Sequence, residues 1–213
     1  MDLIKTLFDI ILHIDAHLDV LIASAGVWVY LILFLIVFCE TGLVVTPFLP
    51  GDSLLFAVGA FAAAGSLDVR WILALLVAAA IIGDSVNFYF GQVVGARILD
   101  FWGGRLVRRE HLERTHRFYE KHGGKTIIIA RFMPIIRTFA PFVAGIGSME
   151  YRRFVMFNVS GALLWVFSIV GGGYFFGNLP LVKRHFSLVI LAIIILSCMP
   201  AVIEWLRHRK AAA

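Results

Sequence analysis

The sequence predicts an all-α polytopic membrane protein in which transmembrane helices are combined with two inverted re-entrant helical hairpins. Of its 213 residues, 61% are hydrophobic and 15% are charged, whereas a soluble domain is about 45–50% apolar and about 25% charged. The mean hydropathy is +0.91. Several uncharged stretches approach or exceed the roughly 20 residues that a helix needs to cross a bilayer. Two other apolar segments are interrupted by prolines and charged residues, which disfavour a continuous helix in lipid.

Four stretches predict membrane crossings. They are residues 20–39, 71–96, 154–182 and 186–203. We expect one membrane domain over residues 20–205. Before it, residues 1–19 place apolar side chains at helical spacing, which predicts an amphipathic helix in the membrane interface. His13 and His17 lie four residues apart on it, a spacing that suits a metal ligand pair as well as two interfacial polar side chains.

Basic residues predict the orientation of the chain. The connector 97–125 carries eight basic and four acidic residues, and the tail 206–213 is also basic. Cytoplasmic segments carry an excess of Lys and Arg, so both segments are expected in the cytoplasm, with the C-terminus. Counting crossings from the connector to the tail requires a hairpin at about 126–150 that enters from inside. Counting backwards from the connector requires another at about 41–67 that enters from outside.

The first predicted hairpin contains two prolines and two carboxylates. Pro47, Pro50 and Gly51 interrupt the helix, and Glu40 and Asp52 flank the interruption. Irregular backbone is tolerated at membrane depth only where protein buries it or where it lines an aqueous cavity. A charge at the bilayer centre costs roughly 2.5–3.5 kcal/mol on insertion scales. These carboxylates therefore need a cation, a proton or water.

The second predicted hairpin has the same plan with the opposite charge. Arg131 and Arg137 lie around Pro134 and Pro141. Similar segments that enter from opposite faces are typical of inverted-repeat transporters, so we expect the two arginines to meet the acids of the first hairpin around a polar chamber. The alternative is that the four charges only form ion pairs that hold the hairpins together. Apolar packing is usually as stable as buried ion pairs, which favours a functional site.

A second polar position interrupts the stretch 71–96. Asp84 and Asn87 are three residues apart and extend a proton path in one interpretation. In the other, they make interhelical hydrogen bonds to neighbours such as Asn158 or Ser160. The sequence leaves both open.

Several function classes are disfavoured. The sequence has no glycine-rich phosphate loop or nucleophile elbow and, apart from His13 and His17, no Cys/His pair at zinc spacing, so we expect no enzyme, no cofactor and no metal centre. The net charge of +5 arises mainly from short basic blocks between apolar stretches, and a nucleic-acid partner is not expected.

Five motifs together resemble the DedA family of bacterial inner-membrane proteins, which belongs with the SNARE-associated, or VTT, proteins. They are FCETG at 38–42, PFLPGD at 47–52, GDSVN at 83–87, FYEKHGG at 118–124 and ARFMPIIRTFAP at 130–141. The resemblance implies facing re-entrant hairpins, an inner-membrane location and translocation of a lipid or lipid carrier that depends on the proton motive force. Undecaprenyl phosphate is the implied cargo in several members. The family's essential acids correspond to Glu40 and Asp52, and its essential arginines to Arg131 and Arg137.

We therefore expect a flippase in which Arg131 and Arg137 bind a lipid phosphate, because a guanidinium binds phosphate bidentately. Glu40, Asp52 and Asp84 would carry the coupling protons. The expected partners are the bilayer and a phosphate-headed lipid, either undecaprenyl phosphate or a phospholipid, and a homo-oligomer is left open. Two alternatives remain: a small-cation/proton antiporter, which gives the arginines no direct role, and a non-transporting scaffold that maintains the cell envelope.

Overall fold

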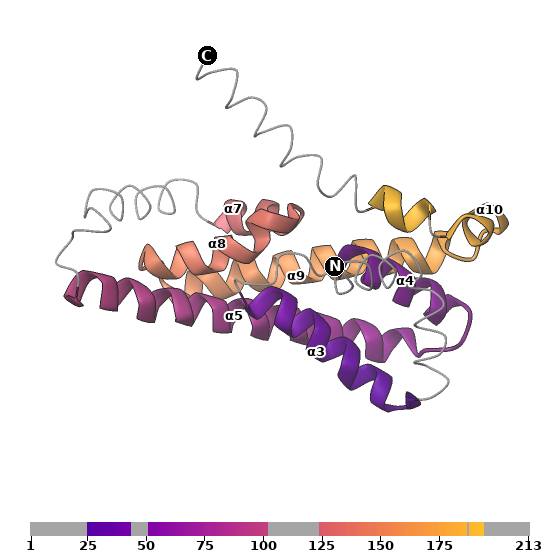
Figure 1. Ribbon diagram of the computed structural model, residues 1–213, viewed down its shortest axis with the longest axis horizontal. Coiled ribbons are helices and arrows are strands. Elements are labelled where there is room, and N and C mark those ends of the chain that lie inside the picture. Colours follow the sequence, from indigo (N-terminus) through magenta and orange to yellow (C-terminus); the bar gives the residue numbers. More distant parts are fainter. Residues whose placement is uncertain (1–24, 44–50, 102–123, 187, 194–213) are drawn as a thin grey trace, which may run out of the picture. The chain divides into compact units, whose positions relative to one another are not determined.

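A computed structural model describes residues 25–43, 51–101, 124–186 and 188–193. Every secondary-structure element in these ranges is a helix (Figure 1). The prediction of an all-helical protein is therefore confirmed for the described residues. Several predicted features lie outside them: the interfacial helix with His13 and His17, the prolines Pro47 and Pro50, connector residues 102–123, the basic tail and most of the stretch 186–203.

The three longest helices in the described ranges are α3 (Trp28–Gly42), α5 (Val69–Phe101) and α9 (Tyr151–Phe176). Two spans, Val69–Val94 in α5 and the whole of α9, are long and apolar enough to cross a membrane. They agree with the crossings predicted at 71–96 and 154–182.

The second of these helices ends six residues before the predicted limit. Helix α9 stops at Phe176, and a short helix, α10 (Pro180–Arg184), follows. Leu179 is extended, with φ −62° and ψ 139°. A proline has no N–H and disfavours helical geometry in the residue before it, so Pro180 starts a new helix instead of continuing α9. Counting uncharged residues did not detect this interruption.

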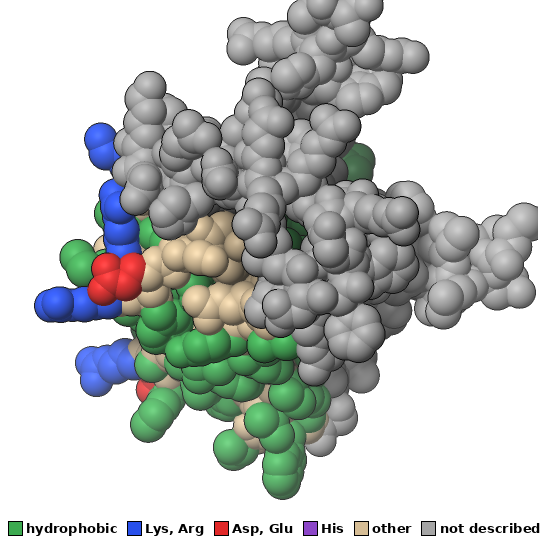
Figure 2. Space-filling model, turned by 90° about the vertical axis from the view of Figure 1, so that its left-hand side faces the viewer, with side chains coloured by type: hydrophobic (Ala, Val, Ile, Leu, Met, Phe, Trp, Pro, Cys, Tyr) green, Lys and Arg blue, Asp and Glu red, His purple; other side chains and the backbone are tan. Residues whose placement is uncertain are grey.

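The long helices expose large apolar side chains. On α5 these include Val86, Phe90 and Val93, and on α9 they include Leu164 and Phe167. Figure 2 shows hydrophobic side chains over much of the described surface in that view, with basic side chains gathered along one edge. Exposed apolar patches of this kind need a partner or lipid to cover them. The surface therefore fits a membrane protein.

The second predicted hairpin contains two short helices with a break between them. Helices α7 (Gly124–Ala130) and α8 (Pro134–Ile146) contact each other. Met133 is extended, with φ −118° and ψ 105°, and Pro134 opens α8. Pro134 accounts for this geometry, because a proline favours an extended residue before it and suits the first turn of a helix.

The predicted break at Pro141 is wrong. Helix α8 continues through Pro141 to Ile146. The missing N–H removes one helical hydrogen bond, to the carbonyl four residues earlier. Pro141 is buried and lines the cavity described below, so tertiary packing overrides its local preference.

In the first predicted hairpin, the described chain resumes at Gly51, where helix α4 (Gly51–Ala63) begins. Asp52 lies in the first turn of α4 and is buried. A negative charge is favoured at this position because the helix dipole is positive at its N-terminus. This dipole offers a structural reason for an acid at residue 52.

The described residues divide into two compact units. One contains 25–36, 51–76 and those from 166 onward, and the other contains 37–43, 77–101 and 124–165. In the first unit, a Cβ added to Gly173 of α9 would overlap the backbone of Phe56 in α4. In the second, a Cβ on Gly91 of α5 would overlap the backbone of Phe142 in α8. Glycine thus permits close helix contact in both units.

We expect Gly173→Ala to lower the stability of the purified protein by about 1–3 kcal/mol, because the added methyl group overpacks a backbone contact. Gly172 is the matched control, since a Cβ there meets no atom within 4 Å. Gly172→Ala should be neutral or stabilising, by up to about 1 kcal/mol, because alanine favours helix. Thermal unfolding in detergent measures both changes, and equal midpoints for the two variants would contradict the packing argument.

Candidate functional site: a buried cavity with two arginines and two carboxylates

The first ion pair joins Glu40 to Arg137. Glu40 lies in the last turn of α3, and Arg137 lies in the first turns of α8. Both residues are buried, with 1% and 6% of their surface exposed. Arg137 Nη2 donates a hydrogen bond to Glu40 Oε1. The structure thus brings together an acid preceding the first break and a base of the second hairpin.

The second ion pair joins Arg131 to Asp84. Arg131 is the first residue after α7, and its Nη2 donates to Asp84 Oδ2 of α5. The same nitrogen donates to Asn158 Oδ1 of α9, at 2.6 Å. Asn158 is fixed in turn because its Nδ2 donates to the carbonyl of Ile81, at 3.1 Å. Arg131 therefore pairs with an acid of α5, where the sequence predicted a partner from the first hairpin.

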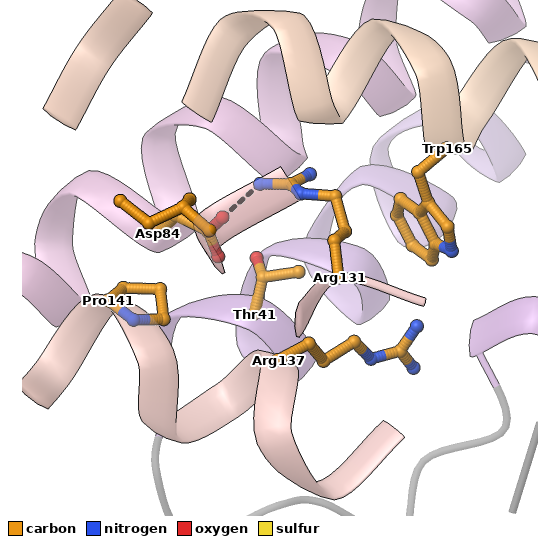
Figure 3. Close-up of a pocket in the computed structure, with 7 residues that line it drawn as sticks. Thr41, Asp84, Arg131, Arg137, Pro141 and Trp165 are labelled. Atoms are coloured by element: carbon orange, nitrogen blue, oxygen red, sulfur yellow. Dashed lines mark hydrogen bonds and ion pairs between the residues drawn. The ribbon is translucent and has the colours of Figure 1, made fainter. Parts of the chain in front are cut away.

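Both arginines line one small cavity. Figure 3 shows Arg131 between Asp84 and Trp165. The lining residues of the cavity are Thr41, Asp84, Ile127, Arg131, Arg137, Pro141 and Trp165. The cavity volume is about 10 Å³, which is about the space that one water molecule needs. The cavity is too small for a phosphate group while both ion pairs are formed.

Trp165 contacts both cations. The Arg131 Cζ lies 5.8 Å and the Arg137 Cζ 5.0 Å from the centroid of the Trp165 ring. A cation within about 6 Å of an aromatic face is attracted by the negative face of the ring. One indole group therefore contributes to the position of both arginines.

The Asn87 side chain makes hydrogen bonds to the backbone next to both members of the first ion pair. Its Nδ2 donates to the carbonyl oxygens of Thr41, at 3.1 Å, and Thr138, at 2.7 Å. Thr41 follows Glu40 in the chain, and Thr138 follows Arg137. These bonds support the interhelical interpretation of Asn87. Asp84, in contrast, forms an ion pair with Arg131, and its side chain lines the cavity.

Asp52 belongs to the compact unit that contains α4, whereas the other four charged residues belong to the second unit. The meeting of Asp52 with the arginines stays a prediction.

Sequence reasoning named Asn158 of α9 only as a hydrogen-bond neighbour of Asp84 or Asn87, and it missed Gly161 and Trp165. Asn158, Gly161 and Trp165 are spaced by three and four residues, so they share one helix face. Gly161 faces the Arg131 side chain, because an added Cβ would lie in ordinary contact with it, 3.5 Å from Arg131 Nε. A tryptophan in the middle of an apolar span was a usable signal, since tryptophan usually lies at the membrane interfaces.

Within the parts of the chain that the structure describes, no three His, Cys, Asp or Glu side chains form a group that could hold a metal ion.

Comparisons with known proteins identify a family and several relatives, some of which are named membrane proteins. The family model described as the VTT domain matches residues 49–175. The chain is 57% identical to protein DedA of Escherichia coli K12 over 100% of this chain and 98% of that protein. It is 39% identical to an uncharacterised membrane protein of Mycobacterium leprae, over 82% and 79% of the two chains. It is 36% identical to the inner membrane protein YghB of E. coli K12, over 79% and 77%. No solved structure matches the chain.

Proposed function

We propose, from the premise that this chain belongs to the DedA family of VTT-domain membrane proteins, that it moves a phosphate-headed lipid between leaflets using the proton motive force. The first candidate cargo is undecaprenyl phosphate and the second is a phospholipid. The proposal places the protein in the bacterial inner membrane, with its C-terminus in the cytoplasm. It needs protons as the coupling ion, and it includes neither catalysis nor a cofactor.

One observation carries the proposal: two buried arginines lie beside one cavity, and each is engaged by a carboxylate. Carboxylate and phosphate oxygens compete for the same guanidinium N–H groups. A lipid phosphate that reaches the cavity would therefore replace Glu40 at Arg137 and Asp84 at Arg131. Arginine suits this exchange because its planar group binds phosphate bidentately and stays charged.

The exchange also explains proton coupling. Glu40 and Asp84 are 1% and 4% exposed, so each carboxylate loses its cation in a nearly dry place when phosphate arrives. Binding a proton removes that cost. Moving a phosphate inward against an inside-negative potential costs about 2.3 kcal/mol per charge per 100 mV. Each proton that moves with the lipid cancels one such charge.

The broken backbone supports an opening toward lipid. The chain is irregular between α7 and α8, and such backbone at membrane depth is found where it is buried in protein or lines an aqueous cavity. In the proposal, α7 and α8 form one re-entrant hairpin and the segment leading into α4 forms its inverted counterpart. Asp52, at the start of α4, is assigned to proton entry or release.

The test is leaflet exchange of a fluorescent polyprenyl phosphate in vesicles that contain the purified full chain, with and without an imposed pH gradient. We expect Arg137→Ala to abolish exchange. We expect Arg131→Lys and Arg137→Lys to slow it at least about tenfold, because lysine cannot bind phosphate bidentately. Arg70→Ala is the control, because Arg70 is an exposed arginine of α5.

Each other result counts against a defined part of the proposal. Full activity of the lysine variants would rule out bidentate capture. Exchange by Arg137→Ala at the wild-type rate would rule out the arginine site. Proton-coupled uptake of a small cation without any lipid phosphate would identify an antiporter instead. Absence of both activities in the wild-type protein would leave the scaffold function.

A further inference from the structure

Trp165 occupies an unusual position for a tryptophan in a membrane helix. It is fully buried in the middle of α9, and among the described residues it is the largest fully buried side chain. Its ring centroid lies 5.8 Å from the Arg131 Cζ and 5.0 Å from the Arg137 Cζ. A structural filler needs no such contact with both cations of a site.

We propose that Trp165 is a positioning residue that holds both guanidinium groups ready for an anion while Glu40 and Asp84 are protonated. The inference rests on the proposed function for the nature of that anion, a phosphate group. It adds a role for a residue that makes no ion pair.

The need for such a residue follows from the charges of the site: the two arginines that contact the indole ring and their carboxylate partners. These are Arg131 at the α7–α8 break, Arg137 of α8, Asp84 of α5 and Glu40 of α3. With both acids ionised, each guanidinium has a carboxylate partner. Once the acids bind protons, two like charges remain close together in a poorly solvated place, where their repulsion is strong.

The other side chains that line the cavity offer little compensation. Ile127 and Pro141 are apolar. Thr41 has a neutral hydroxyl group, which donates to the carbonyl of Val37 at 2.9 Å and carries no charge to offset that of a guanidinium. The indole ring presents a negative face that does not bind protons, so its attraction persists when the carboxylates are neutral. Among the described lining residues, Trp165 is therefore the side chain best suited to stabilise the two guanidinium groups when Glu40 and Asp84 are protonated.

Neighbouring residues of α9 fit this role. Asn158 and Gly161 lie on the same helix face as Trp165. Asn158 accepts a hydrogen bond from Arg131, and Gly161 faces the Arg131 side chain. This face of α9 therefore holds Arg131 by a neutral hydrogen bond and an aromatic surface, neither of which depends on an ionised acid.

The test measures anion binding by the purified full chain, with inorganic sulfate as the probe. Sulfate keeps its charge between neutral and mildly acidic pH, unlike phosphate. Its apparent affinity is obtained from the rise in thermal midpoint with sulfate concentration. We compare the wild type with Trp165→Phe and Trp165→Leu at both pH values. Trp71→Leu is the control, because Trp71 is 65% exposed on α5.

We expect Trp165→Leu to weaken sulfate binding about tenfold and Trp165→Phe about threefold at mildly acidic pH, since indole has the stronger attraction for cations. At neutral pH, with Glu40 and Asp84 ionised, the loss should be smaller. The control should bind as the wild type does. If Trp165→Leu does not fold, the pH dependence of Trp165→Phe decides.

A loss that is equal at both pH values, or a phenylalanine variant no better than the leucine variant, shows a packing role and overturns the inference. A wild type that sulfate does not stabilise also overturns it. Leaflet exchange separates this inference from the proposed function. Sulfate binding with the expected Trp165 dependence, but without lipid exchange, overturns the proposed function alone. Exchange that Trp165→Leu leaves unchanged at both pH values overturns the inference alone.

Discussion

Arg137→Leu is expected to lower the free energy of unfolding by about 3–5 kcal/mol, because it removes one partner of a buried ion pair. Glu40 is 1% exposed, and its carboxylate would stay buried without this guanidinium. Equilibrium unfolding in detergent measures the change. Arg70→Leu is the matched control, since Arg70 is exposed, and it should change the free energy by no more than about 0.5 kcal/mol.

The double variant Glu40→Leu/Arg137→Leu separates structure from function. Replacing both members of a buried pair by apolar residues is often neutral or stabilising, so we expect stability to return to within about 1 kcal/mol of the wild type. Lipid exchange should nevertheless be absent, because the phosphate-binding group is gone. A double variant that is stable and fully active would show that the pair is a structural device, and it would remove Arg137 and Glu40 from the site.

The second large effect is the loss of proton coupling in Glu40→Gln and Asp84→Asn. Each amide keeps the shape of the acid and can accept a hydrogen bond from its arginine, but it cannot bind a proton under these conditions. In the wild type, an imposed gradient of one pH unit should change lipid accumulation about tenfold for each coupled proton. Each single variant should lose one tenfold factor of lipid accumulation. The double variant should exchange lipid without responding to the pH gradient.

Controls for coupling come from the same chain. Glu150→Gln changes an exposed carboxylate and should leave the gradient response intact. Asp52→Asn tests the second acid of the first predicted hairpin. A normal response of Asp84→Asn would mean that Asp84 only holds Arg131, and the coupling role would then rest with Glu40 and Asp52.

Much of the fold could be predicted from local chemistry. Apolar composition and long uncharged stretches predicted a helical membrane protein, and the spans in α5 and α9 agree with it. Pro134 opens a helix after an extended Met133, as its missing N–H and fixed φ dictate. The same rule placed a break at Pro141, which the surrounding packing overrode.

The pairing of the charged residues needed the tertiary structure. An isolated charge in an apolar medium is costly in any fold, so buried acids and arginines are expected to form ion pairs. Which acid meets which arginine depends on how each helix is rotated and where helices cross. Arg131 therefore pairs with Asp84 of α5, a partner that charge spacing along the chain did not identify.

The sequence by itself determined the class of protein, the family resemblance and the kinds of charge that must be buried, because these depend on composition and local backbone chemistry. Only the tertiary structure decided that Trp165, Asn158 and Asn87 belong with those charges. Their contacts join residues that are 27 to 51 positions apart, and such contacts depend on helix packing, which no local pattern encodes.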